Sequence, residues 1–319
     1  MLFDTEREDF DKMNLNFYLV LGGFAYDDGI IFALDRVNHR ILKLSEEGEI
    51  IGQIGQIGQD EQSLYKPQTF FIKKGLIYII NGDNSVKVYD LNGKFKKKIS
   101  IQEELYGVSS IVISSKKMIF LDSKNKSKFL NKKLISCFNE SGKLIKIFGN
   151  IITTKDIEAY CFFNKAKLTI DNKDNIYGAF FYYPVIFKYT SQGRLGFYKN
   201  LRKSKIKGVL EIDKFVKESN LSFETPENVI SEDGIYSIRY IFGIEVIKNN
   251  LLCGIRRKIY IFDLNGNYKN KVIKLFIKNV PFILRGFALD RKNREYVLGY
   301  GHLKDKYELK FIKFKIPKL

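Results

Sequence analysis

The chain has 319 residues, 45% of them hydrophobic, and a formal net charge of +18 from 54 Lys and Arg against 36 Asp and Glu. A chain of this length can bury a sizeable core. No run approaches the roughly 18 consecutive apolar residues of a membrane-spanning helix, so we expect no membrane span. The cationic excess favours polyanionic partners, because their bound counterions are released on association.

The N-terminal residues "MLFDTEREDFDKMN" are acidic and polar, with neither the basic nor the apolar segment of an export signal. We expect a cytoplasmic protein if Met1 is the true start, and an exported or lipid-anchored protein if a signal was removed. The three cysteines, Cys137, Cys161 and Cys253, form no close pair and have no metal-binding spacing. They are interpreted as buried free thiols, which favours a reducing compartment.

Short apolar runs separated by turn residues repeat along the chain from residue 29 onward. Residues 29–55 contain three such runs, GIIFALD, RILKLS and EIIGQIG, and residues 75–101 repeat the plan. The most regular feature is a turn in which a Leu or an aromatic residue is followed by three mostly polar residues and a glycine. Glycine tolerates positive φ, so each turn is expected to join two strands of a hairpin. The turns occur at 44–48, 89–93, 138–142, 189–193 and 262–266.

The five turns are spaced by about 45 to 50 residues, with one longer interval, and this is the length of a four-stranded propeller blade. Residues 282–316 contain strand-like runs without a clean turn and are interpreted as a sixth blade. We therefore predict an all-β fold, a six-bladed β-propeller of four-stranded antiparallel blades in a single domain spanning residues 1–319. Residues 1–16 are expected to supply the missing outer strand of the last blade and to close the ring.

The first blade carries a motif known from other propellers. The stretch "DRVNHRILKLSEEGEIIGQIG" (35–55), followed by "KPQTFFI" (66–72), resembles an NHL repeat. The resemblance implies a propeller in which the Asp, Asn, His and Arg of the motif are mainly structural. In this chain, the motif places those four roles on Asp35, Asn38, His39 and Arg40. The absence of Trp argues against the tryptophan-aspartate repeat family.

The repeated triplets in "IGQIGQIGQ" (51–59) fit this plan. The apolar Ile residues argue against a solvated linker. We expect Ile54 and Gly55 to end the first blade, the segment after them to cross to the next blade, and Pro67 to open that blade.

One insertion departs from the repeat, at about residues 201–230 between the predicted fourth and fifth blades. Its middle, "GVLEIDKFVKESN", has apolar residues at helical spacing, which predicts a short amphipathic helix. The helix either covers one end of the ring or binds a partner, since irregular insertions on rigid scaffolds often carry contacts. The candidate partner-binding residues are Val209, Ile212, Phe215 and Val216.

Catalytic motifs are sparse. The chain has two histidines, His39 and His302, and no nucleophile elbow, phosphate-binding loop or His-Glu metal motif. A metal-dependent enzyme that resembles the six-bladed gluconolactonase group would need Glu, Asn and Asp at the central channel to bind a hard cation. The candidate metal ligands, Asn81, Asp122 and Asp290, each follow a strand, where such residues more often cap the strand end. No cofactor is expected.

Two basic clusters are candidates for polyanion binding, although lysines scattered over solvated loops would give the same composition. The cluster at 123–133 includes an aromatic residue, a mix that suits RNA. The candidate residues are Lys96, Lys97, Lys98, Lys126, Lys128, Phe129, Lys132 and Lys133.

The sequence-based hypothesis for function is a non-enzymatic propeller scaffold that binds a protein partner through its loops and the face of its central channel. Two alternatives stay open. One is binding of RNA or another polyanion through a basic face, and the other is a divalent-metal-dependent hydrolase or lyase of the gluconolactonase-like type.

Overall fold

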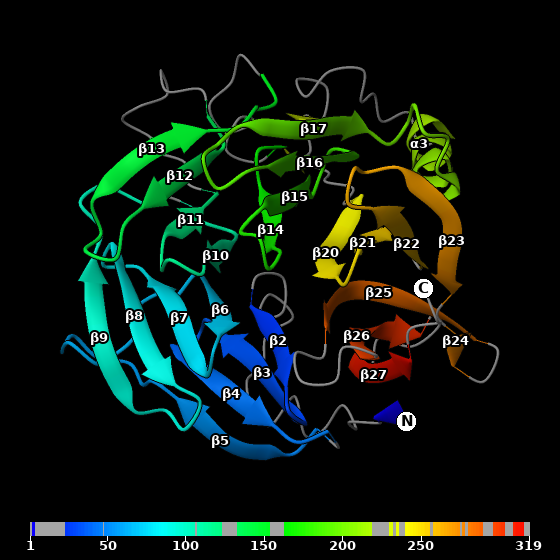
Figure 1. Ribbon diagram of the computed structural model, residues 1–319. Helices are drawn as coiled ribbons and strands as arrows, with labels where there is room; N and C mark the ends of the chain where they lie inside the picture. The colour runs from blue at the N-terminus through cyan, green and yellow to red at the C-terminus, as the bar shows by residue number, and fades with distance from the viewer. Residues whose placement is uncertain are drawn as a thin grey trace.

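The strands form antiparallel sheets in the order in which they occur along the chain. Five four-stranded sheets, called blades 1 to 5, are arranged around a central axis (Figure 1). The first strand of each blade is innermost and the fourth lies at the rim. The computed structural model describes residues 2–3, 23–46, 48–105, 107–122, 133–153, 163–218, 230–231, 234–235, 240–255, 258–274, 276–277, 280–289, 296–303 and 309–315.

The blades have similar strand lengths. Blade 1 contains β2 (Phe24–Asp27), β3 (Ile30–Asp35), β4 (Arg40–Leu44) and β5 (Ile50–Ile54). Blade 2 contains β6 (Thr69–Lys73), β7 (Leu76–Asn81), β8 (Ser85–Asp90) and β9 (Phe95–Ser100). Blade 3 contains β10 (Ile111–Ile113), β11 (Ile119–Leu121), β12 (Ile135–Phe138) and β13 (Leu144–Phe148). Blade 4 contains β14 (Ala166–Ile170), β15 (Ile176–Phe180), β16 (Val185–Tyr189) and β17 (Leu195–Asn200). Blade 5 contains β20 (Ile241–Ile247), β21 (Asn250–Ile255), β22 (Lys258–Asp263) and β23 (Tyr268–Lys274).

The core lies between neighbouring blades, because the inner strands are buried on both faces of each sheet. Ile77 and Ile79 of β7 belong to a buried cluster with blade 1. Tyr78 and Ile80, which alternate with them, belong to a cluster with blade 3. Alternate side chains of a strand point to opposite faces of the sheet, so one strand serves two cores. This explains why the inner strands read as nearly continuous apolar runs.

The five turns predicted from the sequence join the third and fourth strands of the five blades. Their glycines have φ between 74° and 91°, values that L-residues with side chains rarely adopt. Polar side chains at the start of each turn stabilise it: Asp90 accepts backbone hydrogen bonds from Asn92 and Lys94 at 3.0 and 2.9 Å. Asp263 accepts two in the same way, both at 2.8 Å. The prediction of four-stranded antiparallel blades is therefore confirmed.

The predicted number of blades is wrong for the part of the chain that the structure describes, which contains five four-stranded blades and not six. The C-terminal strands form a different sheet, of order β1-β27-β26-β25-β24, beside blades 1 and 5 (Figure 1). This is the region where the sequence has no clean turn. The sheet contains β1 (Leu2–Phe3), β24 (Phe276–Ile277), β25 (Val280–Leu289), β26 (Tyr296–Leu303) and β27 (Leu309–Lys315).

Ring closure by residues 1–16 stays a prediction, because most of that segment lies outside the described residues. Residues 2 and 3 form β1, which pairs antiparallel with β27. The described chain also includes a two-stranded sheet of β18 (Ile230–Ser231) and β19 (Gly234–Ile235).

The propeller has two ends, which differ in what they contain. At the end called the cavity face, the first strands finish and short turns lead into the second strands. At the end called the crossing face, the second strands finish and segments arrive from the rim of the preceding blade. Figure 1 looks along the axis that joins the two faces.

The NHL-like residues of blade 1 lie at the crossing face and stabilise a turn. Asp35 is fully buried and accepts hydrogen bonds from the backbone and side-chain nitrogens of Asn38 at 3.0 and 2.8 Å. Arg40 Nε donates to the same carboxylate at 3.0 Å. His39 adopts φ of 53° in this turn.

The repeated triplets that follow end β5 and begin the crossing to blade 2. Gly55 has φ of 77°, and a Cβ added there would lie 2.4 Å from Leu64 Cδ1. The backbone is therefore too close to Leu64 for a larger residue. This close approach explains a glycine at that point of the crossing segment.

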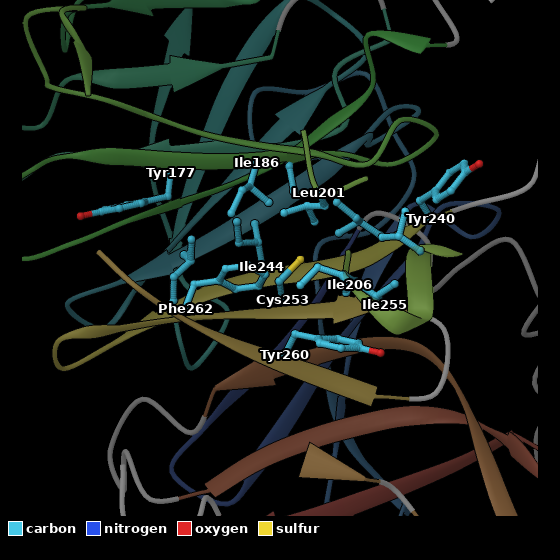
Figure 2. Close-up of a cluster of buried hydrophobic side chains, with 14 of the residues drawn as sticks. Tyr177, Ile186, Leu201, Ile206, Tyr240, Ile244, Cys253, Ile255, Tyr260 and Phe262 are labelled. Atoms are coloured by element: carbon cyan, nitrogen blue, oxygen red, sulfur yellow. The ribbon is translucent and has the colours of Figure 1, made fainter. Parts of the chain in front are cut away.

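The insertion carries helix α3 (Lys207–Glu218), which lies at the rim beside β17 and β23 (Figure 1). Val209 and Ile212 are 0% and 2% exposed and belong to the cluster between blades 4 and 5. Figure 2 shows this cluster, in which Ile206 and Tyr240 lie beside residues of both blades. The apolar side of the helix therefore packs on the propeller itself.

Candidate active site

A cavity of about 880 Å³ lies at the cavity face, where the first strands of four blades end. Its walls come from β2, β6, β14, β20 and β25, from the turns that follow β6, β14 and β20, and from Tyr177 and Lys188 of blade 4. Both signs of charge are present among its described residues. Its carboxylates are Asp27, Asp171, Asp174 and Glu245, and its lysines are Lys73, Lys74, Lys167, Lys173, Lys188 and Lys248.

One carboxylate is oriented across the junction of blades 4 and 5. Thr169, on β14, is 4% exposed, and its Oγ1 donates a hydrogen bond to Glu245 Oε2 on β20 at 3.1 Å. Lys167 precedes Thr169 by two residues and therefore lies on the same side of β14. Glu245 and Lys167 thus line the cavity at the junction of blades 4 and 5.

A second carboxylate connects blades 3 and 4. Asp174 accepts hydrogen bonds from the backbone nitrogen of Ser115 at 2.7 Å and from the hydroxyl of Ser115 at 2.5 Å. Lys73 Nζ lies 4.0 Å from Asp174 Oδ1 and donates to the carbonyl oxygen of Ile113 at 2.5 Å. The Asp174 carboxylate is therefore already engaged by donors.

A third group joins Asp171, Tyr177 and Lys188 of blade 4. The hydroxyl of Tyr177 donates to Asp171 Oδ2 at 3.1 Å. Burial, together with the negative charge of Asp171, raises the pKa of Tyr177, so the phenol stays protonated. The ammonium of Lys188 lies 5.1 Å from the centre of the Tyr177 ring, and it contacts the carbonyl oxygen of Leu264 at 3.4 Å.

This arrangement can bind and polarise a small molecule. A carboxylate held by a neighbouring hydroxyl is suited to take a proton, and nearby ammonium groups can donate one or stabilise developing negative charge. The four blades deliver these groups from strand ends and short turns, which are rigid supports.

The predicted metal ligands lie elsewhere. Asn81 and Asp122 end the second strands of blades 2 and 3 and so lie at the crossing face. Asn81 accepts a hydrogen bond from the backbone nitrogen of Tyr65 at 2.8 Å and donates to Asp83 at 2.8 Å. Asp290 is outside the described residues.

Asp122 is fully buried and its oxygens are taken by donors. It accepts from the backbone nitrogens of Ser109, Ser110 and Ala166 at 2.9, 2.6 and 3.1 Å, and from the hydroxyl of Ser109. Throughout the described part of the chain, no three His, Cys, Asp or Glu side chains are placed to hold a metal ion. We therefore derive no reaction step through a metal.

The predicted polyanion-binding lysines of β9 lie on the rim of blade 2, each within an ion pair. Lys96 pairs with Asp90 at 2.8 Å, Lys97 with Glu140 at 2.5 Å and Lys98 with Asp83 at 3.0 Å. Lys133 is exposed. The other members of that cluster, Lys126, Lys128, Phe129 and Lys132, lie outside the described residues.

The predicted partner-binding residues on the insertion divide in the same way. Val209 and Ile212 are buried against blades 4 and 5 and are not accessible to a partner. The side chains of Phe215 and Val216 are not among those described. The exposed apolar residue of this helix is Leu210, at 46%.

The sequence analysis missed the cavity residues. The available signal was the set of short turns after the first strands, such as Lys74-Gly75 and Lys248-Asn249, which repeat lysine at equivalent places. Two apolar strands joined by such a dipeptide form a hairpin, and in a propeller these hairpins all lie at one end.

Comparisons with known proteins support the fold. The crystal structure of a Bacteroides fragilis protein has 12% sequence identity, covers 93% of this chain and 91% of its own, and has a TM-score of 0.56. A catalytically inactive virginiamycin B lyase from Staphylococcus aureus with quinupristin has 10% identity, covers 99% of both chains and has a TM-score of 0.50. No protein-family profile matches the sequence, and no curated protein matches it.

These comparisons define the class as a β-propeller. The NHL assignment has no support from sequence families. The hypothesis of a non-enzymatic scaffold that binds a protein partner is contradicted, because a propeller of similar fold is a lyase. No helix among the described residues is long and apolar enough to cross a membrane.

Proposed function

We propose that this protein is an enzyme that binds a small molecule in the central cavity and cleaves it by acid–base chemistry, as a lyase or a hydrolase. The observation that carries the proposal is the junction of blades 4 and 5. There, Thr169 orients the Glu245 carboxylate at the cavity, and Lys167 lies on the same side of the neighbouring strand. Cavities with a few convergent polar groups are the usual sites of small-molecule chemistry.

In the proposed elimination, Glu245 takes the proton from the carbon next to a carbonyl group. The electron pair of that C–H bond forms a carbon–carbon double bond, and the bond to the leaving oxygen breaks. That oxygen takes a proton from Lys167, which returns to its charged form when it regains a proton from solvent. In the hydrolytic alternative, Glu245 takes a proton from water, whose oxygen attacks the carbonyl carbon. The bond from that carbon to the leaving oxygen then breaks, and the leaving oxygen takes a proton from Lys167.

The roles fall on Glu245 and Lys167 because the described lining of the cavity contains no histidine. The inactive virginiamycin B lyase has alanine in place of one histidine. The described lining of the cavity in this chain contains no histidine that could take an equivalent role, so we do not transfer the catalytic arrangement of that lyase. His39 lies in a crossing-face turn, and the side chain of His302 is outside the described set.

The test is product formation from quinupristin, from simple lactones and from lactones that carry carboxylate or phosphate groups, followed by mass spectrometry with added Mg²⁺ and, separately, with a chelator. Ring opening by elimination leaves the mass unchanged, whereas hydrolysis adds one water. We expect Glu245→Gln to lower turnover by about 10² to 10⁴-fold, the usual contribution of a general base.

The matched control is Glu140→Gln, which removes a carboxylate from a surface ion pair with Lys97 and should leave turnover unchanged. No product from any of these compounds under either condition, or full activity of Glu245→Gln, would overturn the proposal.

A further inference from the structure

Three of the turns at the cavity face carry an exposed lysine. Lys74, Lys173 and Lys248 belong to the turns after the first strands of blades 2, 4 and 5, and all three line the cavity. They are exposed and are called the turn lysines. Because these turns lie at one end of the propeller, the turn lysines surround the opening of a single cavity.

Two of the turn lysines occupy backbone positions that suit other residues better. Lys74 and Lys248 have φ of 50° and 51°, in the left-handed region where glycine and asparagine are favoured. The equivalent turn of blade 1 has Asp28 and Gly29 with φ of 51° and 80°. Lysine at such a position costs conformational energy, and Lys66, Lys117 and Lys205 adopt the same conformation outside the described lining of the cavity.

The turn lysines have no ion-pair partner among the described residues, in contrast to Lys73 and the lysines of β9. Lys73 is paired with Asp174, and the β9 lysines are paired with three carboxylates. The Asp174 carboxylate is engaged by Ser115, and the Glu245 carboxylate is engaged by Thr169. The described lining has six lysines against four carboxylates, so its positive charge exceeds its negative charge.

Lys188, on β16 of blade 4, adds a fourth cation to the lining of the cavity. Its described contacts are the Tyr177 ring at 5.1 Å and the carbonyl oxygen of Leu264 at 3.4 Å, with no carboxylate. A concave site with an excess of one sign of charge raises the local concentration of oppositely charged solutes. Lysine ammonium groups act as point charges toward phosphate and carboxylate groups.

From these observations we infer that the substrate is a small molecule with two or more negatively charged groups. This inference rests on the proposed function, which identifies the cavity as the active site. The turn lysines and Lys188 bind its carboxylates or phosphates. The reacting part of the molecule then lies near Glu245.

The test is isothermal titration of the full chain with citrate, a tricarboxylate, and separately with pyrophosphate, which distinguishes the two sources of anionic charge. Glucose is the neutral comparison. Titrations at low salt and at about 150 mM salt, where screening acts over about 8 Å, show whether binding is electrostatic. The variant replaces all three turn lysines (Lys74→Gln, Lys173→Gln and Lys248→Gln), and a matched variant replaces three β9 lysines (Lys96→Gln, Lys97→Gln and Lys98→Gln).

We expect at least one anion to bind the wild-type chain and glucose not to bind. The cavity variant should bind that anion about tenfold more weakly or worse, whereas the β9 variant, with the same loss of charge, should stay within about twofold. Equal weakening in both variants, or binding of neither anion, overturns the inference. The variant Glu245→Gln distinguishes failure of this inference from failure of the proposed function. It should retain anion binding even if turnover is never detected.

Discussion

The two faces of the propeller contain the same types of residue in opposite states. At the crossing face, Asp122 is fully buried and accepts three backbone hydrogen bonds. Lys87 on that face is 2% exposed and donates to the carbonyl oxygens of Asp60, at 3.2 Å, and Ser63. At the cavity face, Lys74 and Lys248 are exposed and have no described ion pair.

The difference shows which charged groups are available to a ligand. A buried polar group is costly unless its hydrogen bonds are made, so the crossing face uses its charges to hold the segments between blades. Burial also lowers the pKa of Lys87. The cavity face keeps its turn lysines exposed, and this is where we place function. Three predictions test this division between structure and function.

The largest expected effect is at Asp122. We expect Asp122→Ala to lower the free energy of unfolding by about 3 to 4 kcal/mol, because it leaves buried backbone N–H groups of blades 3 and 4 without acceptors. Urea unfolding followed by circular dichroism measures it. The matched control is Asp174→Ala at the cavity face, where a half-buried carboxylate is lost. Equal losses in the two variants would contradict the division between faces.

A smaller loss is expected at Lys87. The change Lys87→Met keeps the length of the side chain but removes the donor to the crossing segment, and we expect a loss of about 1 to 2 kcal/mol. Part of the effect is offset, because a buried charge is also removed. Lys74→Met, on the cavity face, should change stability by less than about 0.5 kcal/mol. Thermal unfolding of both variants at neutral pH gives the comparison, and unchanged stability of Lys87→Met would show that this lysine does not hold the segment.

The smallest effect has the opposite sign. We expect Lys74→Gly to stabilise the protein by about 0.5 to 1 kcal/mol, because glycine adopts the left-handed conformation without strain. The same change in a regular strand, Lys96→Gly, should destabilise it by about 1 kcal/mol. A destabilised Lys74→Gly variant would show that this lysine serves the fold and would remove one argument for its role in binding.

The sequence predicted the propeller because its repeat has a physical cause. The glycines that end the third-to-fourth-strand turns all need positive φ, and the five marked turns correspond to the five blades in the structure. The unmarked region, residues 282–316, is where the count failed. There the strands join a sheet of different order, which no local turn signal records.

The site was harder to predict, because its residues come from different blades. Thr169 and Glu245 are 76 positions apart in the chain, and nothing local indicates that they meet. The sequence directed attention to Asn81 and Asp122, since polar residues after strands are a metal-site pattern as well as a capping pattern. Only burial and hydrogen bonding distinguish the two roles.

The most direct test of the central claim is hydrogen–deuterium exchange of the full chain with and without citrate. We predict slower exchange in the cavity-face turns around residues 74–75, 172–175 and 248–249, and no change in the crossing segment 56–66. Protection confined to the crossing segment, or protection nowhere, would contradict the assignment of ligand binding to the cavity face.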